Sequence, residues 1–376
     1  MTELPVSVRL NPFKGCDGPE GAAVPWSPYG RTLPSRPVFT LDPLFHAGCY
    51  YVQDASAMYV GHLFRKLIQR FDAPVRVLDL CAAPGGKTTD AAVSLRERFG
   101  HEFLLVANEL QRKRASVLAD NVAIWGDPAV RVSSADPAAF APLKGFFDII
   151  IADVPCSGEG MFRKDPRAEK EWSPELVKLC AARQKRILAD VWPALRPGGV
   201  LLYSTCTYSR EENDDNLEWA ARTLGGEIIP PEDEFGLRRT DFGHLLKAGE
   251  VQGEGQWAGA LVKNGVAASH AAGEVKIPGQ MTRLSRGEQK GKDFIPNPDY
   301  VLSYDYQGEY PSVELALRDA LRFLHRDSFP LEAAAKGYNV VCYKGHPLGI
   351  VKNLGSRCNN LHPLSRRILM NIPAEL

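Results

Sequence analysis

The feature that most constrains the fold is the stretch 75–100, where a short apolar run, a glycine-containing turn and a helical pattern follow one another. Residues 75–80 have the composition of a buried β-strand, and the turn at 79–89 has the sequence DLCAAPGGKTT. One face of the following helix is marked by Ala91, Ala92, Leu95 and Phe99. Because glycines let backbone amides approach a ligand and a helix N-terminus favours negative groups, this unit predicts a site for a nucleotide-like ligand.

Two ligand classes compete for this turn. Its Gly86, Lys87 and Thr88 resemble the end of the phosphate-binding loop of nucleotide hydrolases, but that loop requires a glycine where this chain has Cys81. The glycine spacing of dinucleotide-binding proteins is also missing. An acidic residue at the strand end, Asp79, followed by small residues, instead favours S-adenosylmethionine (SAM). A turn that binds no ligand is the remaining alternative.

Strands and helices alternate from this unit to about residue 262. Further strands are predicted at 103–109, 130–136, 147–153 and 200–206, and two late antiparallel strands at 227–229 and 257–262. Helices are predicted at 87–100, 112–124, 173–195 and 211–224. This alternation predicts an α/β fold with a doubly wound, mainly parallel sheet, the Rossmann-like sheet of SAM-dependent methyltransferases.

The composition divides the chain into four segments. Residues 1–70 are rich in proline, glycine and aromatic residues and predict a β-rich entry segment, then a helix capped by Asp54. Residues 71–264 form the sheet domain, 265–291 a linker, and 292–376 a small α+β or barrel module. In the outer segments we expect strands at 7–10, 37–40, 300–306, 339–343 and 348–352 and a helix at 312–325.

Charge and cysteine usage exclude several classes of protein. The formal net charge is +0, so any nucleic-acid binding must come from a local patch. The last forty residues are the basic end. No apolar run of about 18 residues and no secretory pattern is present, so we expect a cytoplasmic protein. The 8 cysteines form no C-x-x-C pair and the 8 histidines show no metal spacing. Reduced cysteines, no metal and a monomer are therefore expected.

Four acids lie at the carboxyl ends of successive predicted strands: Asp79, Glu109, Asp136 and Asp153. In an open parallel sheet, ligands bind beyond these ends. Glu109 follows the second strand, where an acid bonds a ribose hydroxyl, and Asp136 at the third is placed to accept from an adenine amino group. An adenosine-bearing ligand satisfies both residues.

Two cysteines, Cys156 and Cys206, lie just past the ends of the fourth and fifth strands. Because these strands are neighbours in such a sheet, about 4.8 Å apart, both thiols are expected to face one pocket. A thiol beside a methyl donor suits methylation at C5 of a pyrimidine, because addition of a thiolate at C6 activates C5. Asp153 is placed to stabilise the protonated adduct of cytosine, and the second thiol to assist release.

These segments strongly resemble the Sun-type RNA cytosine-C5 methyltransferases, which use SAM. The resemblance covers about residues 7–263, and its motifs include DVPCSGEGMFRKDP and YSTCTYSREEN. It implies that Cys206 is the nucleophile, that Cys156 helps to release the product and that Asp153 lies between cofactor and cytosine. It also implies that Lys87 faces the pocket. The SAM loop would consist of Cys81, Ala82, Ala83, Pro84, Gly85, Gly86 and Lys87.

The C-terminal module is similar to the end of bacterial 16S ribosomal RNA methyltransferases of this family, which carry a PUA-like RNA-binding domain. Candidates for contacts to RNA phosphates are Lys344, Lys352, Arg357, Arg366 and Arg367. The expected partner is 16S rRNA or the small ribosomal subunit. A tRNA m5C methyltransferase and an inactive RNA-binding assembly factor remain as alternatives. Because relatives usually have a helical region ahead of the segment that starts this chain near residue 7, the exact target nucleotide stays open.

Overall fold

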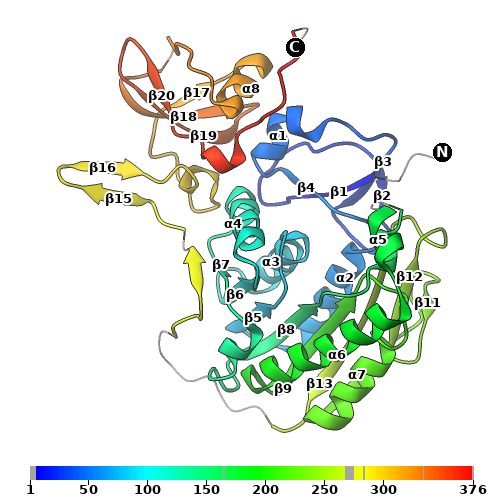
Figure 1. The fold of residues 1–376 in the computed structure, drawn as a ribbon. Helices are drawn as coiled ribbons and strands as arrows, with labels where there is room; N and C mark the ends of the chain where they lie inside the picture. The colour runs from blue at the N-terminus through cyan, green and yellow to red at the C-terminus, as the bar shows by residue number, and fades with distance from the viewer. Residues whose placement is uncertain (1–5, 164–165, 267–274, 283, 333, 375–376) are drawn as a thin grey trace.

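The structure is a computed structural model that describes residues 6–163, 166–266, 275–282, 284–332 and 334–374. Its largest element is a ten-stranded sheet with the order β11-β12-β13-β9-β8-β5-β6-β7-β14, in which β10 also pairs with β13 (Figure 1). The strands are β5 (Val75–Asp79), β6 (Phe103–Asn108), β7 (Val130–Ser133), β8 (Phe147–Asp153), β9 (Leu195–Thr205), β10 (Gly226–Ile229), β11 (Arg238–Arg239), β12 (Gly243–Lys247), β13 (Gly255–Lys263) and β14 (Gln280–Thr282).

The centre of this sheet is parallel, as the sequence predicts. The chain runs from β5 outward to β6 and β7 and then returns to β8 on the other side of β5, so a crevice is expected beyond the carboxyl ends of β5 and β8. The register places Asp79 beside Ile151 and Asp153 beside Ser204. The late strands β13 and β10 are antiparallel, which confirms the predicted edge.

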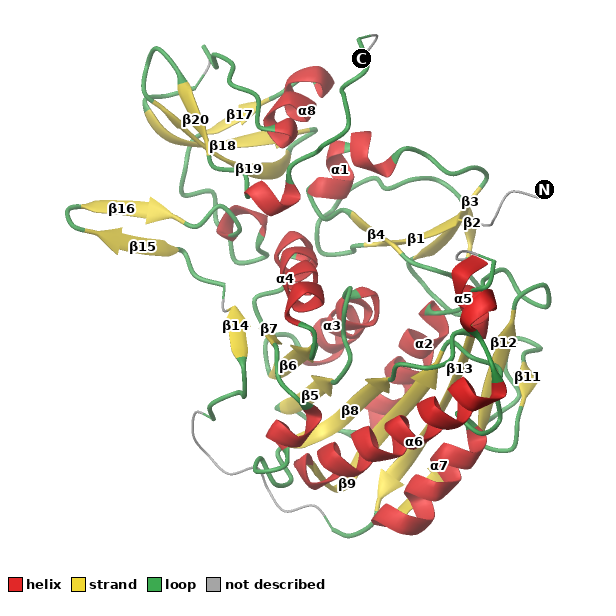
Figure 2. Cartoon of the chain, viewed as in Figure 1, coloured by secondary structure: helices red, strands yellow, loops and turns green. Residues whose placement is uncertain are grey.

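Helices cover both faces of the sheet (Figure 2). One face packs against α2 (Met58–Leu67), α3 (Gly86–Phe99) and α4 (Arg112–Trp125), and the other against α6 (Pro174–Val191) and α7 (Asp214–Ala220). Helix α6 begins where Pro174 follows Ser173, whose Oγ accepts a hydrogen bond from the Leu176 amide. Leu118 of α4 and Leu188 of α6 are fully buried, and burial of such a side chain contributes roughly 1.5–3 kcal/mol.

The two ends of the chain form one body above the sheet. The N-terminal sheet has the order β2-β3-β1-β4 and the C-terminal sheet β17-β18-β19-β20. Their elements are β1 (Val6–Leu10), β2 (Ala22–Ala23), β3 (Gly30–Leu33), α1 (Pro43–His46), β4 (Tyr50–Val52), β17 (Ser312–Glu314), α8 (Leu317–His325), β18 (Gly337–Tyr343), β19 (His346–Asn353) and β20 (Cys358–Asn360). Figure 1 shows them side by side, and Val8 and Tyr50 share a hydrophobic core with Leu321 and Val341.

Several expected elements differ from the structure. The predicted strands at 37–40 and 300–306 are 3-10 turns, Phe39–Leu41 and Tyr300–Leu302, because local carbonyls take their amides, as in the bond from the Tyr300 amide to Asn297. Helix α6 ends at Val191, four residues before the predicted end at residue 195, and the residues from Leu195 on, Pro197 included, belong to β9. The start of the helix predicted at 312–325 is β17, which pairs in parallel with β18.

The segment 265–291 is more ordered than a linker. Strand β14 pairs with β7 at the edge of the main sheet, and β15 (Gly287–Lys290) forms a hairpin with β16 (Asp293–Pro296) that projects from the body in Figure 1. Residues 267–274 of the predicted linker lie outside the described residues.

The expectation that all cysteines are reduced is wrong for one pair. Cys16 and Cys49 form a disulfide. Hydrogen bonds from the Asn11 amide to Cys49 and from the Asn11 side chain to Gly48 hold the residues before β4 against the loop that follows β1. This pairing joins loops that are distant in the sequence, so spacing alone does not reveal it.

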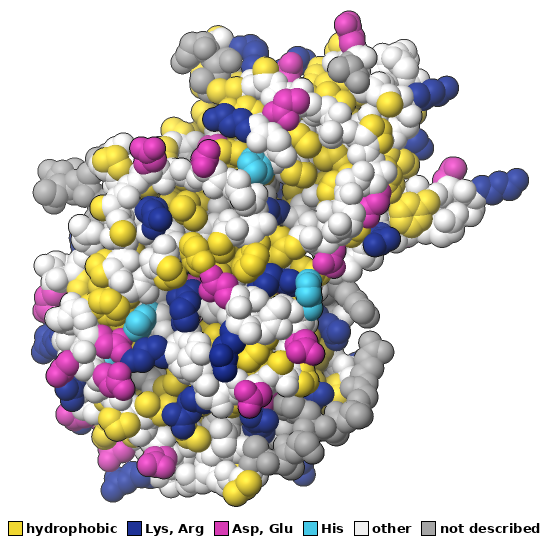
Figure 3. Space-filling model, turned by 180° about the vertical axis from the view of Figure 1, so that it is seen from behind, with side chains coloured by type: hydrophobic (Ala, Val, Ile, Leu, Met, Phe, Trp, Pro, Cys, Tyr) yellow, Lys and Arg dark blue, Asp and Glu magenta, His cyan; other side chains and the backbone are white. Residues whose placement is uncertain are grey.

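The distribution of charged side chains on the surface agrees with the formal net charge of +0. On the face shown in Figure 3, side chains of both charges are interspersed rather than gathered into one basic field. Among the described residues, no helix is both long enough and apolar enough to cross a membrane.

Candidate active site

The two predicted thiols meet at the carboxyl ends of β8 and β9. Asp153 pairs with Ser204 in the register of these parallel strands, so the loops that leave them start side by side. The Sγ atoms of Cys156 and Cys206 are 3.1 Å apart and are not bonded to each other. The predicted adjacency of the two thiols is confirmed, and their separate roles stay predictions.

Lys87, in the first turn of α3, points toward this pair. Its Nζ donates a hydrogen bond to Asp153 Oδ2 at 2.8 Å, and Ser204 Oγ donates to Asp153 Oδ1 at 2.8 Å. Burial alone lowers the pKa of Lys87, but the charge and hydrogen bond of Asp153 outweigh it and raise the pKa. Lys87 is therefore a cation inside the site, and Asp153 is fixed from both sides.

The surroundings make the two thiols different. A hydrogen bond from Cys156 lowers the pKa of Cys206, although burial and the charge of Asp153 oppose the shift, and Lys87 acts in the same direction as Cys156. The same hydrogen bond, together with burial, raises the pKa of Cys156. The pair therefore favours a thiolate on Cys206 that accepts a hydrogen bond from the Cys156 thiol.

Only one of the two carboxylate oxygens of Asp79, at the end of β5, accepts a hydrogen bond from the described residues. Asp79 is fully buried, and Oδ2 accepts a hydrogen bond from Thr88 Oγ1 at 2.6 Å, whereas Oδ1 has no partner among the described residues. Burial, together with the charges of Asp153 and Glu109, raises the pKa of Asp79 to about 7. A cationic ligand beside Oδ1 would satisfy this oxygen and favour the ionised carboxylate.

The two acids predicted to hold adenosine lie at the neighbouring strand ends. Glu109 is buried and accepts a hydrogen bond from the Gln111 amide at 2.9 Å. Asp136 is exposed and caps the 3-10 turn Pro137–Phe140 by accepting from the Ala138 amide at 3.0 Å. Sequence reasoning missed Asn108, which joins these ends through bonds to Leu80, Ser133 and Ala135. Its only signal is a polar residue at the end of an apolar strand.

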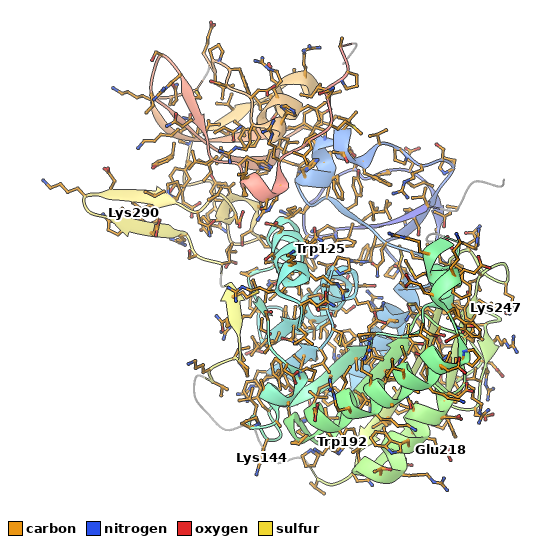
Figure 4. All side chains as sticks on the ribbon, in the orientation of Figure 1. Trp125, Lys144, Trp192, Glu218, Lys247 and Lys290 are labelled. Atoms are coloured by element: carbon orange, nitrogen blue, oxygen red, sulfur yellow. A yellow bond between two sulfur atoms is a disulfide. The ribbon has the colours of Figure 1, made fainter. Side chains whose placement is uncertain are left out.

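The predicted cofactor loop, residues 81–87, is held from two directions. Gly85 has a φ of +116°, which favours glycine, and the Ala82 amide donates to Asn108. From the N-terminal sheet, the fully buried Arg9 donates to the Gly86 carbonyl at 3.1 Å and to Thr89 Oγ1 at 2.5 Å. Its guanidinium lies 4.7 Å from the ring centre of Trp125. Figure 4 labels Trp125 at the end of α4. Sequence reasoning missed Arg9, whose signal is a single cation inside an apolar strand.

Buried bonds also position the loop that carries Cys156. Glu212 accepts hydrogen bonds from the Ser157 amide at 3.1 Å and from Gln184 Nε2 at 2.7 Å. The Gly160 amide donates to the Cys206 carbonyl at 2.8 Å, and a Cβ on Gly160 would lie 2.9 Å from that oxygen. These hydrogen bonds therefore connect the loop that carries Cys156 to the loop that carries Cys206.

The candidates for RNA contact fall into two groups. Lys344, Arg357 and Arg367 are exposed, and Lys352 lies half-buried over the Tyr338 ring. Arg366 does not belong with them, because its side chain is 7% exposed and forms ion pairs at 2.8 Å with Asp120 of α4 and with Asp299. Arg366 joins the C-terminal module to the main domain, and its assignment as a phosphate contact is corrected.

Comparison with known proteins finds similarity for two segments of the chain. Residues 70–224 match the family described as 16S rRNA methyltransferase RsmB/F, and residues 310–368 match the RsmF PUA domain. The ribosomal RNA small subunit methyltransferase F of Escherichia coli O7:K1 (strain IAI39) is 42% identical over 193 residues, which are 50% of this chain and 39% of that protein. The protein of the same name from Salmonella agona (strain SL483) gives the same figures. The match thus spans about two fifths of the length of these relatives.

Two solved structures from Pyrococcus horikoshii share the fold. A methyltransferase homolog protein is 25% identical with a TM-score of 0.59, covering 70% of this chain and 87% of that one. NSun6 with SFG is 25% identical with a TM-score of 0.53, covering 63% and 58%. Residues 70–224 of this chain are therefore similar to the RsmB/F methyltransferase family, and residues 310–368 are similar to the RsmF PUA domain.

Proposed function

We propose that this chain transfers a methyl group from SAM to C5 of a cytosine in RNA, with small-subunit ribosomal RNA as the substrate. The observation that carries the proposal is the unbonded pair of thiols, 3.1 Å apart, beside the Lys87–Asp153 pair at the switch point of a methyltransferase sheet. The relatives named as small-subunit rRNA methyltransferases support the choice of RNA.

The residues at the strand ends fit SAM. Asp79 interacts electrostatically with Asp153 and Glu109, and Asp79 Oδ1 has no hydrogen-bond partner among the described residues. SAM carries a sulfonium and an ammonium group, so it would place positive charge beside this buried carboxylate. Glu109 and Asp136 would hold the adenosine, and residues 81–87 would form the loop around it. NSun6 with SFG, a SAM analogue, supports this choice. When bound, SAM supplies an electrophilic methyl group.

Cys206 is the proposed nucleophile. Its Sγ, as the thiolate stabilised by Cys156 and Lys87, forms a bond to C6 of the cytosine and makes C5 nucleophilic enough to accept the methyl group. The Lys87–Asp153 pair, whose charges both act on Cys206, would hold the N3 and amino edge of the cytosine during the addition. Because the thiol must reach C6, the base has to be unstacked from its neighbours.

Cys156 is the proposed residue for release. In the adduct, Cys206 no longer carries a negative charge, which removes the first cause of the raised pKa of Cys156. Cys156 can then lose its thiol proton to water, and the resulting thiolate takes the C5 proton. The C6–Sγ bond breaks, its electrons return to Cys206 as thiolate, and the double bond between C5 and C6 is restored.

Incubation of the purified chain with methyl-deuterated SAM tests the proposal. Separate reactions contain 16S rRNA, small ribosomal subunits or tRNA, and their nucleosides are analysed by mass spectrometry. We expect deuterated 5-methylcytidine in ribosomal RNA, its loss in Cys206→Ala, and its retention in the control Cys358→Ala, which changes a half-buried cysteine of β20. Label in tRNA alone would reassign the substrate. Binding of SAM without label in any RNA would favour the assembly factor.

A further inference from the structure

A second group of sulfur and nitrogen ligands lies far from the thiol pair, at the junction between the N-terminal sheet and the C-terminal module. It consists of Cys16 in the loop after β1, Cys49 just before β4 and His346 at the start of β19. Their two Sγ atoms and the His346 Nδ1 all lie within 4.8 Å of one another, and Cys16 Sγ is 3.4 Å from Nδ1. Among the described residues, no other set of three such side chains comes this close.

These three side chains offer the donor atoms that Zn²⁺ prefers. Two thiolates and an imidazole form three corners of a tetrahedral zinc site, with Zn–S distances of about 2.3 Å and Zn–N distances of about 2.0–2.1 Å. Two sulfurs on one zinc ion are then about 3.8 Å apart. The Cα atoms of Cys16 and Cys49 are 5.6 Å apart, so rotation of the side chains brings the reduced sulfurs to that separation.

We propose that, once the Cys16–Cys49 disulfide is reduced, Cys16, Cys49 and His346 bind one Zn²⁺ ion, with water or the Asp17 carboxylate in the fourth position. Asp17 is exposed, follows Cys16 and interacts electrostatically with His346. The charge of Lys14 acts on His346 in the opposite direction, but its ammonium is hydrogen-bonded to the Leu302 carbonyl and lies over the Tyr304 ring.

The reduction requires a dithiol of the thioredoxin class. Its two electrons and two protons break the Sγ–Sγ bond and give two thiols, while the dithiol becomes a disulfide. Binding of Zn²⁺ then releases the two thiol protons to water and leaves His346 neutral.

The disulfide state and the zinc-bound state connect different parts of the chain. The disulfide joins two residues of the N-terminal segment to each other, whereas the ion also holds His346 of the C-terminal module. Reduction with zinc binding therefore adds a cross-link between the N-terminal sheet and the PUA domain, which already share a hydrophobic core.

Cobalt provides a spectroscopic probe for this site in the full-length chain. The protein is reduced, the reductant is removed, and Co²⁺ is added stepwise without oxygen. We expect thiolate-to-cobalt charge-transfer absorption that saturates at one equivalent and disappears when Zn²⁺ is added. Cys16→Ser/Cys49→Ser should lose this absorption, and His346→Ala should bind at least tenfold more weakly. Cys156→Ser/Cys206→Ser is the matched control and should keep it, because it changes the other close pair of cysteines.

A second measurement needs no variant. In the reduced wild-type chain, Zn²⁺ should slow the alkylation of Cys16 and Cys49 by iodoacetamide at least tenfold, as measured by peptide mass spectrometry, and should leave Cys358 unaffected. Equal alkylation with and without Zn²⁺ would overturn the proposal. So would a cobalt signal that survives in Cys16→Ser/Cys49→Ser but vanishes in Cys156→Ser/Cys206→Ser.

Discussion

The two close cysteine pairs of this chain differ in what holds them and in what charges surround them. Cys156 and Cys206 follow two hydrogen-bonded strands and stay unbonded beside a partly buried lysine, Lys87. Cys16 and Cys49 lie on loops, are joined to each other and are close to an imidazole. A cation beside a thiol favours the reactive thiolate, whereas an imidazole adds a third metal ligand. The surroundings, rather than the residue type, therefore separate a reactive pair from a structural one.

The largest expected effect tests the asymmetry inside the reactive pair. Cys206→Ala should reduce methylation by a factor on the order of 10⁴ or more and leave no protein–RNA adduct, because it removes the nucleophile. Cys156→Ala should still attack but stall before release. It should therefore accumulate an adduct that survives boiling in detergent and is visible as a gel shift. An adduct formed by Cys206→Ala but not by Cys156→Ala would reverse the two roles.

The next effect tests whether the N-terminal sheet supports the catalytic end of the main sheet. Arg9→Ala should lower the free energy of unfolding by about 3 kcal/mol, because it removes the fully buried cation of Asp90 and the Gly86 carbonyl and leaves Asp90 only the partly exposed Arg65. Urea unfolding measures this change. SAM affinity, measured by calorimetry, should fall as well, since Arg9 holds the first turn of α3.

Arg36→Ala is the control for this prediction, because Arg36 is an exposed arginine that follows β3 of the same N-terminal sheet. It should change stability by no more than about 0.5 kcal/mol. Equal effects of the two variants would mean that Arg9 acts only through general packing.

The arrangement of the reactive pair could be predicted from the sequence because it follows from topology. Parallel strands place their carboxyl ends at one edge, so residues just after two apolar runs had to meet there, and Cys156, Cys206, Lys87 and Asp153 do. Residues that act from a distance in the sequence, such as Arg9, gave no comparable signal. Nothing in an apolar strand indicates which helix turn its single arginine will reach.

A smaller effect concerns the pH dependence of cofactor binding. Burial raises the pKa of Asp79 to about 7, above its usual value of 3.8. Its contribution to stability is therefore complete below about pH 4 and is lost as the pH rises through 7. A cationic ligand favours the ionised carboxylate, so SAM affinity should rise by up to about tenfold per pH unit below pH 7 and level off above it. Calorimetry from pH 5.5 to 8.5 measures this slope, and Asp79→Asn should flatten it. An unchanged slope in that variant would assign the proton to another group.

The junction of the two chain ends could not be predicted in the same way. The sequence separated an N-terminal segment from a C-terminal module, but in the structure Val8 and Tyr50 pack in one core with Leu321 and Val341. Pairings between loops and between distant sheets depend on tertiary packing rather than on the local periodicity of apolar residues. Removal of the C-terminal module would therefore expose this core, so single substitutions are the better probes of RNA binding.

The smallest expected effect separates two adjacent arginines at this junction. Arg367 is exposed, and if it contacts a phosphate, Arg367→Ala should lower the slope of log affinity against log salt by about 0.7–0.9 without changing stability. Arg366 is paired with Asp120 and Asp299, whose carboxylates are partly exposed, so Arg366→Ala should instead lower the unfolding free energy by roughly 1.5–3 kcal/mol. Filter binding to 16S rRNA at several salt concentrations, together with urea unfolding, distinguishes the two outcomes. If Arg366→Ala changed only the salt slope, the ion pairs with Asp120 and Asp299 would not hold the module in place, and the PUA domain would be free to move against α4.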